Sequence, residues 1–141
     1  MTVIAWDGKT LAADRQGTCA GMRYRATKLR RIGKEALAIC GDYDYGTALM
    51  EWYERGASPE AWPSFQKTGD WVRLIVASRG RCFHYEREPK KLRVLDRFMA
   101  WGSGRDYAMG AMATGVDARR AVLVASRFEN GCGLGVDVVS F

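Results

Sequence analysis

The sequence contains three places where two short, mostly apolar runs flank a glycine-containing turn. The turns are Asp7-Gly8, Gly33-Lys34 and Arg79-Gly80, and the flanking runs are residues 3–6 with 10–13, 28–32 with 36–40, and 72–78 with 81–86. Asp-Gly between such runs is a strong hairpin signal, because glycine adopts a positive φ without steric penalty. The pattern predicts antiparallel sheets built from consecutive hairpins, with four strands in the first 40 residues and a loop around Gly17 and Gly21.

Segments with helical spacing follow these hairpins. Asp42, Asp44 and Asp117 are candidate N-caps, because a short carboxylate side chain accepts hydrogen bonds from the first free backbone N–H groups of a helix. Pro59 and Pro63 leave little room for a regular helix after the first one. The predicted helices are residues 42–55, at most a short one within 57–70, then 104–112 and 117–128, with further strands within 92–101 and at 135–141.

The order of elements is therefore strands, helix, strands, a helix pair and a last strand. Two antiparallel sheets packed between helical layers satisfy this order, because each sheet then buries one face against helices. We predict an α+β fold, a four-layer α/β/β/α sandwich with a shortened first helical layer. With 141 residues and 48% hydrophobic residues, the chain is expected to form a single domain over residues 1–141.

Composition excludes several other classes of protein. No apolar run approaches the roughly 18–20 residues of a membrane span, and the N-terminal residues do not resemble an export signal, so we expect a cytoplasmic protein without a membrane partner. The four cysteines are widely spaced and are expected to be reduced. Because His84 is the only histidine and the cysteine spacing is wrong for zinc, no metal site is expected.

The net charge of +6 raises the question of nucleic acid. Basic residues concentrate within residues 23–34 and 87–97, and such patches bind phosphate without sequence specificity. Solvated strand faces explain the same residues, and we favour that interpretation. Nucleic acid is therefore not expected as a partner, although a nucleic-acid-binding scaffold is kept among the alternatives.

Thr2 is the candidate nucleophile. A threonine hydroxyl needs a base, and a threonine at the chain terminus carries one in its own α-amino group, whose ordinary pKa of about 7.7–8.0 suits a general base near neutral pH. Thr2 follows Met1, and a small residue at this position is the kind that methionine aminopeptidase exposes. Removal of Met1 is thus a condition of the hypothesis, since a retained Met1 would turn the catalytic amine into an amide.

Several motifs in order along the chain resemble one family. They are Thr2-Val3-Ile4-Ala5, Leu11-Ala12-Ala13-Asp14-Arg15-Gln16, Lys28-Leu29-Arg30-Arg31-Ile32, Leu37-Ala38-Ile39-Cys40-Gly41, and Gly102-Ser103-Gly104 leading to Tyr107-Ala108. The chain resembles the proteasome β-subunit and HslV-type N-terminal threonine peptidases, which are Ntn hydrolases. It would be a compact member of that family.

The resemblance implies five catalytic positions: Thr2, Asp14, Lys28, Gly41 and Ser103. Thr2 would attack the scissile carbonyl, and Lys28 would sit beside its hydroxyl and favour the alkoxide. Asp14 would hold Lys28 charged and oriented. The Gly41 N–H would face the developing oxyanion, and Ser103 would hydrogen-bond the terminal amine, although a helix N-cap is an equally open role for Ser103.

The resemblance also implies substrate and partners. A substrate strand would lie between residues 17–19 and the Gly41 loop, with Thr18, Cys19 and Gly41 as substrate-binding residues. The expected assembly is a homo-oligomeric, stacked ring in a bacterial or phage-infected cytoplasm, with an AAA+ unfoldase as a further partner. No cofactor is required, but family members can bind a monovalent cation through loop carbonyls, and residues 130–136 are the matching loop.

The sequence departs from the family in two places. The supporting aspartate and serine of proteasome subunits have no clear counterpart within residues 126–131, where Glu129 or Asn130 are the nearest substitutes. The second long helix is also reduced to residues 57–70. The alternatives that remain are an Ntn hydrolase of a small amide, or a catalytically inactive ring or scaffold protein.

Overall fold

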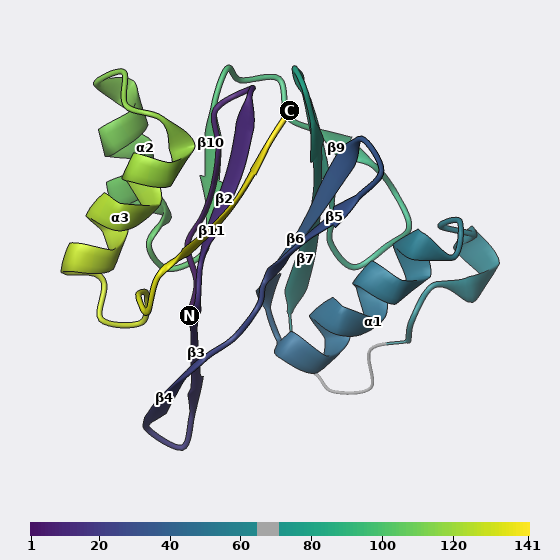
Figure 1. Cartoon of the computed structure of the whole chain (residues 1–141). Helices are drawn as coiled ribbons and strands as arrows, with labels where there is room; N and C mark the ends of the chain where they lie inside the picture. The colour runs from purple at the N-terminus through teal and green to yellow at the C-terminus, as the bar shows by residue number, and fades with distance from the viewer. Residues whose placement is uncertain (65–70) are drawn as a thin grey trace.

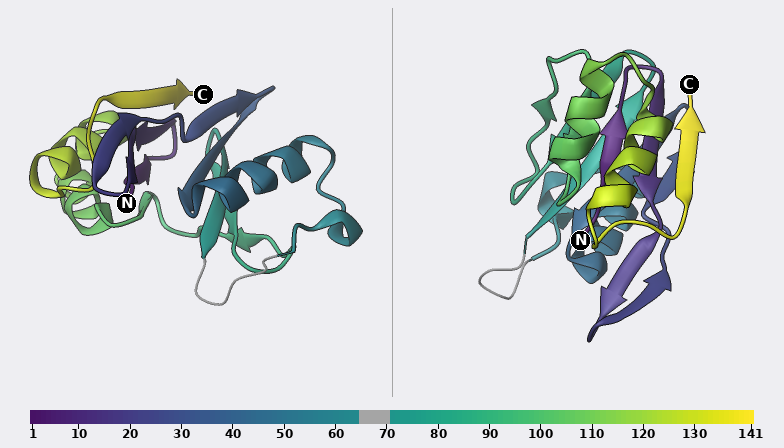
Figure 2. Two further views of the ribbon diagram at one scale, coloured as in Figure 1. Left: turned by 90° about the horizontal axis from the view of Figure 1, so that it is seen from below. Right: turned by 90° about the vertical axis from the view of Figure 1, so that its left-hand side faces the viewer.

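A computed structural model of the chain describes residues 1–64 and 71–141. Two antiparallel sheets lie face to face, and helices cover the outer face of each, so that the molecule has the four layers expected from the order of its elements (Figure 1). The helix pair lies on one side and the first helix on the other, with both sheets between them (Figure 2). The predicted α/β/β/α arrangement is confirmed.

The first sheet has four strands in the order β10-β1-β2-β11. These strands are β1 (Ile4–Trp6), β2 (Thr10–Asp14), β10 (Met99–Trp101) and β11 (Val136–Ser140). The predicted Asp-Gly turn joins β1 to β2, and the Asp7 Oδ1 accepts the N–H groups of Lys9 and Thr10 at 2.9 and 2.8 Å. The first and last segments of the chain therefore lie in one sheet, on either side of β2.

Two antiparallel helices cover this sheet, α2 (Arg105–Ala113) and α3 (Ala118–Phe128). The predicted cap of α3 is present, since the Asp117 side chain accepts the Arg120 N–H at 2.8 Å. The inner face of α3 is built of small residues, and Ala118, Ala121 and Ala125 are fully buried. Small side chains there allow the helix to approach the sheet closely.

The second sheet has five strands in the order β5-β6-β7-β8-β9. They are β5 (Leu29–Ile32), β6 (Glu35–Gly41), β7 (Val72–Ser78), β8 (Arg81–Tyr85) and β9 (Leu92–Arg93). On its outer face lie one regular helix, α1 (Tyr43–Glu54), and a short 3-10 turn, η1 (Pro59–Ala61). The predicted short helix within 57–70 is thus reduced to η1 among the described residues, and its remaining part at 65–70 lies outside them.

Strand alternation distributes the apolar residues among three interfaces. In β6, Leu37 and Ile39 pack toward α1, whereas Ala36, Ala38 and Cys40 pack toward the first sheet. The same alternation divides β1 between the other sheet and the helix pair. A period of two is what a strand buried on both faces requires, and it fixes the register because a slip by one residue would exchange the faces.

One hairpin departs from the sequence prediction. The first 40 residues contain six strands instead of four, because β3 (Gln16–Cys19) and β4 (Met22–Arg25) form a separate two-stranded sheet where a loop was predicted. All four β4 residues are exposed, so no buried face imposes an apolar alternation on them. The hairpin projects from the body of the molecule between the two sheets (Figures 1 and 2).

The other expected boundaries agree with the structure. Asp42 caps α1, with its Oδ1 accepting the Tyr45 N–H at 3.0 Å, and Asp44 lies in the first turn. All four cysteines are unpaired. Within the described ranges, every helix falls short of the length and hydropathy that crossing a bilayer demands.

Candidate active site

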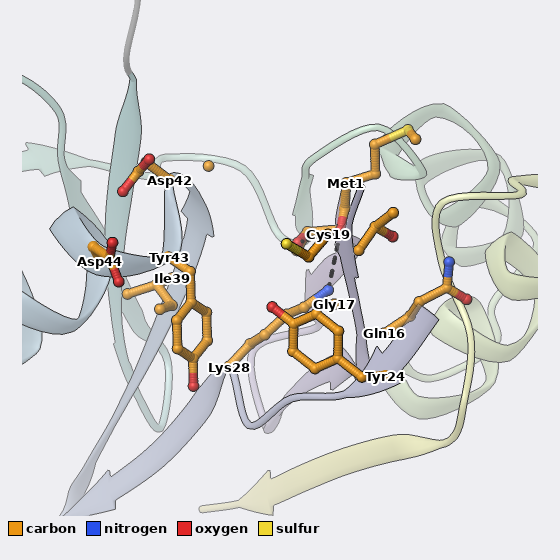
Figure 3. Close-up of a pocket in the computed structure, with 13 residues that line it drawn as sticks. Met1, Gln16, Gly17, Cys19, Tyr24, Lys28, Ile39, Asp42, Tyr43 and Asp44 are labelled. Atoms are coloured by element: carbon orange, nitrogen blue, oxygen red, sulfur yellow. Dashed lines mark hydrogen bonds between the residues drawn. The ribbon is translucent and has the colours of Figure 1, made fainter. Parts of the chain in front are cut away.

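A cavity of about 450 Å³ opens between the end of β6, the start of the chain and the β3–β4 hairpin (Figure 3). Five of the residues predicted for catalysis or substrate binding line it: Thr2, Thr18, Cys19, Lys28 and Gly41. These residues lie far apart in the sequence, and the docking of the two sheets brings them together. The cavity is therefore the candidate active site.

Thr2 is buried at the base of β1, with only 5% of its surface exposed. Its Oγ1 donates to the Met1 carbonyl oxygen at 2.8 Å. Its backbone N–H points to the Ser103 Oγ at 3.3 Å. The nitrogen that would become the free amine thus already has a hydroxyl partner while Met1 is attached.

Lys28 lies beside Thr2 and is 4% exposed. Its Nζ donates to the Asp14 Oδ1 at 2.8 Å. It also donates to the Met1 carbonyl oxygen at 3.1 Å (Figure 3). The same carbonyl oxygen therefore accepts from both Lys28 and the Thr2 hydroxyl. Removal of Met1 would leave the ammonium group and the hydroxyl facing the space that this oxygen occupied.

Asp14 is completely buried, and its charge is compensated from four directions. Its Oδ1 accepts from the Lys28 Nζ and from the Val3 N–H at 3.0 Å, and its Oδ2 accepts from the N–H groups of Gln16 and Gly133, both at 3.1 Å. A carboxylate out of water is stable only with such a complete set of donors. The set satisfies both carboxylate oxygens and fixes the position of Lys28.

Gly102 and Ser103 lie against the carbonyl group of Thr2. A Cβ at Gly102 would overlap the Thr2 carbonyl, and the residue has a φ of +96°, so only glycine fits there. The Ser103 Oγ lies 3.4 Å from the Thr2 carbonyl oxygen, and α2 has no side-chain cap. Of the two roles that the sequence left open for Ser103, the structure therefore shows contact with Thr2 and not capping of the helix.

Gly41 ends β6 at the opposite side of the cavity. Its φ is +111°, and a Cβ would overlap the Trp71 carbonyl oxygen, so a side chain is excluded here as well. The chain turns from β6 into α1 at this point and exposes its backbone to the cavity. A glycine placed in this way permits close approach of a ligand backbone.

The third side of the cavity comes from the hairpin that the sequence analysis missed. Gly17, Thr18 and Cys19 of β3 line the cavity together with Tyr24 of β4. Thr18 and Cys19 are exposed. The segment predicted to contact a substrate backbone is thus extended, as that role requires, but it belongs to a strand rather than to a loop.

Gln16 is a site residue that sequence reasoning did not single out. It is 2% exposed, lines the cavity, and donates from its Nε2 to the Asn130 carbonyl oxygen at 3.0 Å. Through this bond it connects β3 to the loop whose Gly133 N–H holds Asp14. A buried polar side chain has no periodic signal, and only its position two residues after Asp14 could have drawn attention to it.

The loop at residues 130–136 contacts the site from the side of α3. The predicted substitutes Glu129 and Asn130 do not reach Thr2: the Glu129 carboxylate accepts the Gly131 N–H, and Asn130 contributes its backbone carbonyl to Gln16. The carbonyl oxygens of Gly133 and Gly135 both accept the Arg15 N–H. Both carbonyl oxygens therefore already accept a donor from the protein itself.

The cysteine that contacts Ser103 is not a competing nucleophile. Cys132 lies 3.8 Å from the Ser103 Oγ, and burial, with the Asp14 charge, raises the pKa of its thiol to about 11. It is protonated near neutral pH and therefore weakly nucleophilic. In the part of the chain that the structure covers, no three His, Cys, Asp or Glu side chains gather as a metal site would need.

Comparisons with known proteins agree with this architecture. No protein-family model and no curated protein matches the sequence. Among solved structures, the BPH of Thiobacillus denitrificans superposes with a TM-score of 0.74 and 20% identity, covering 99% of this chain and 96% of that one. The same protein in complex with epoxomicin gives a TM-score of 0.72 and 18% identity, covering 99% and 97%.

A eukaryotic protein has the same fold. HslV from Trypanosoma brucei superposes with a TM-score of 0.70 and 22% identity, covering 98% of this chain and 97% of that one. The superposition covers nearly all of both chains, so the architecture is shared over almost their whole lengths. Over nearly its whole length, the chain has the fold of these HslV and BPH structures.

Proposed function

We propose that this chain is an N-terminal threonine peptidase subunit, with Thr2 as nucleophile after removal of Met1. One observation carries the proposal: the buried Lys28–Asp14 pair lies beside Thr2, and both Lys28 and the Thr2 hydroxyl contact the same oxygen atom. A buried cation next to a hydroxyl stabilises the alkoxide form relative to water. Met1, which would be removed, is 68% exposed.

The first half of the reaction forms an ester. The Thr2 Oγ attacks the carbonyl carbon of the scissile amide, and its proton passes to the α-amine of Thr2, directly or through one water. The Lys28 charge stabilises the oxygen as the proton leaves, and the backbone at Gly41 faces the substrate oxygen that becomes negative. When the C–N bond breaks, the ammonium group returns its proton to the leaving amine.

The second half restores the enzyme. A water molecule transfers one proton to the free α-amine and attacks the ester carbonyl, and the Thr2 Oγ takes the proton back as it leaves. The products are a carboxylic acid and an amine, and no electrons are exchanged. Ser103 orients the amine throughout, as its Oγ already lies near the Thr2 nitrogen.

We propose a peptide backbone as substrate, because two walls of the cavity present extended backbone. Thr18 and Cys19 are exposed on β3, and Gly41 ends β6 across from them. An extended segment between the two would gain main-chain hydrogen bonds that do not depend on its sequence. The alternative of a small-amide hydrolase would require a closed pocket, and the exposure of β3 favours the peptide.

Activity on a fluorogenic peptide tests the proposal. Intact mass first establishes whether Met1 is absent, and the processed protein is expected to hydrolyse the peptide. Thr2→Ser keeps both hydroxyl and amine and should retain activity, whereas Thr2→Ala should lose it. Lys28→Ala should also lose activity. Lys9→Ala is its matched control, because Lys9 is exposed, and it should retain activity. Processed protein that hydrolyses no peptide, or a Thr2→Ala variant as active as the parent, would refute the assignment.

An inhibitor gives a second, independent test. Epoxomicin is bound by the Thiobacillus denitrificans BPH. We expect it to bind the processed form of this chain, and to bind neither Thr2→Ala nor a form that retains Met1. Equal binding by all three forms would show that the cavity binds epoxomicin without a free Thr2, and would count against Thr2 as the nucleophile.

We further propose a homo-oligomeric ring in the cytoplasm, fed with folded proteins by an AAA+ unfoldase. The support is the exposure of large apolar side chains: Leu95 is 85% exposed, and Phe128, which is 61% exposed, stacks on the half-exposed Tyr107. Native mass spectrometry measures the assembly. A monomer at micromolar concentration would contradict the ring.

A further inference from the structure

The wall of the cavity opposite Thr2 is formed by the first turn of α1. Asp42, Tyr43 and Asp44 lie there side by side in the sequence and all line the cavity, together with Ile39 at the end of β6 (Figure 3). The catalytic proposal uses none of these side chains. They are therefore available to contact the substrate, and we ask which kind of substrate they would bind.

Among the described residues, the charged side chains that line the cavity are of one sign once the catalytic pair is set aside, the only other charge there being the chain's own amino terminus. The positive charge of Lys28 is compensated by Asp14 at 2.8 Å, and this pair is buried. Asp42 uses one carboxylate oxygen as the cap of α1, and neither Asp42 nor Asp44 forms an ion pair with any residue in 1–64 or 71–141. Two carboxylates thus face the cavity without a cationic partner within those ranges.

The surface between the carboxylates and Thr2 is apolar. The Tyr43 ring stands along the cavity and is 45% exposed, and its hydroxyl is held by a hydrogen bond to the Thr27 carbonyl oxygen at 3.2 Å. This bond fixes the ring as a wall. Ile39 adds an aliphatic edge next to it.

We infer that the cavity selects a lysine or arginine side chain on the residue that supplies the scissile carbonyl. Such a side chain has two parts that match the two parts of the wall. Its aliphatic stem would pack on Tyr43 and Ile39, and its cationic head would reach Asp44 and the free oxygen of Asp42. The face of the tyrosine ring attracts a cation as well. The inference rests on the proposed peptidase function.

The size of the preference follows from exposure. Asp44 is exposed, so its interaction with a substrate cation is screened by water and is comparable to a surface ion pair. Such a pair corresponds to a change of up to about fivefold in an equilibrium or rate ratio. The positive end of the α1 dipole lies nearby and offsets part of the field. We therefore expect a graded preference and not an absolute one.

Three peptides that differ only at the scissile position test the inference. With lysine, leucine or glutamate before an aminocoumarin leaving group, processed protein should give kcat/KM in the order lysine, leucine, glutamate. Asp44→Asn should lower kcat/KM for the lysine peptide about fivefold and leave the leucine peptide unchanged. Asp44→Lys should place glutamate above lysine.

The control variant is Asp106→Asn. Asp106 has an 88% exposed side chain in the first turn of α2, so this variant removes the same charge from a helix of the opposite layer. It should change none of the three rates. Because Asp44 also stabilises the first turn of α1, thermal melts of each variant and the leucine peptide report any general damage to the fold.

The outcomes separate the two proposals. Cleavage of the leucine or glutamate peptide at or above the rate of the lysine peptide overturns the inference and leaves the peptidase function intact. An equal effect of Asp44→Asn on the lysine and leucine peptides also overturns it. Cleavage of none of the three by protein with a free Thr2 overturns both.

Discussion

Replacing Asp14 by asparagine is expected to cost far more than the loss of one ion pair. Each carboxylate oxygen accepts two donors, Lys28 and Val3 on one oxygen, Gln16 and Gly133 on the other. Whichever way the asparagine amide turns, its NH₂ group replaces one of these oxygens. Two donors then face another donor and lose their acceptor. The variant also leaves the Lys28 ammonium buried without its anion.

Breaking a buried pair from one side typically costs about 3–5 kcal/mol. For a chain of this length, that loss corresponds to a decrease in Tm of about 10–20 °C. Lys28→Met should cost less than Asp14→Asn, because the carboxylate keeps its three backbone N–H donors whereas the ammonium keeps only the Met1 carbonyl. The double variant should be less destabilised than the sum of the single ones, since it leaves no uncompensated charge.

Chemical denaturation and thermal melts of the parent, the two single variants and the double variant measure their stabilities. Intact mass confirms that all four proteins have the same N-terminus. Asp106→Asn serves as the control because its carboxylate is 88% exposed, and it should melt with the parent. The account would be wrong if Asp14→Asn melted within one or two degrees of the parent. It would also be wrong if Lys28→Met were the more damaging of the two.

Three further predictions use matched features of the fold. Gly102→Ala should lower the free energy of unfolding by about 1–3 kcal/mol more than Gly115→Ala, as measured by chemical denaturation. Both residues have φ near +97°, but only a Cβ at Gly102 overlaps the Thr2 carbonyl. Equal losses would show that the overlap is relieved. Burial, with the Arg73 charge, lowers the pKa of His84, so the unfolded chain takes up its proton first and stability should fall as the pH drops below about 6.5. His84→Gln should reduce that slope in urea melts at pH 7.5 and 5.5, and an unchanged slope would exclude the histidine as its source. Iodoacetamide at pH 8 should add one adduct per native chain by mass spectrometry, at exposed Cys19, because burial raises the pKa of the other three thiols to about 11–12; two or three rapid adducts would contradict this.

The sequence predicted those parts of the fold that depend on local chemistry. Glycine turns located the β1–β2, β5–β6 and β7–β8 hairpins, and Asp42 and Asp117 marked the starts of α1 and α3 because an N-cap is a contact between near neighbours. The β3–β4 hairpin was missed for a physical reason. With all of β4 exposed, its stability does not come from an apolar face, and no periodic pattern is required of its residues.

The candidate site was predictable only in part. The positions of Thr2, Asp14 and Lys28 came from the resemblance of short motifs, since nothing local indicates that residues 14 and 28 meet. The structure adds Gln16 and Gly133, whose contributions are a buried amide and a backbone N–H. Contacts of that kind depend on the docking of distant segments and have no signature in composition or spacing.

The four donors around Asp14 come from Val3 just before β1, from Gln16 at the start of β3, from Lys28 just before β5, and from Gly133 in the loop before β11. Nearly the whole chain must therefore have been synthesised, and its distant segments must have met, before this set of donors is complete. In a partly synthesised or misfolded copy, Thr2 has no such complete arrangement beside it. Under the proposed function, hydrolytic competence would in this way be coupled to completed folding, and no indiscriminate peptidase would arise during synthesis.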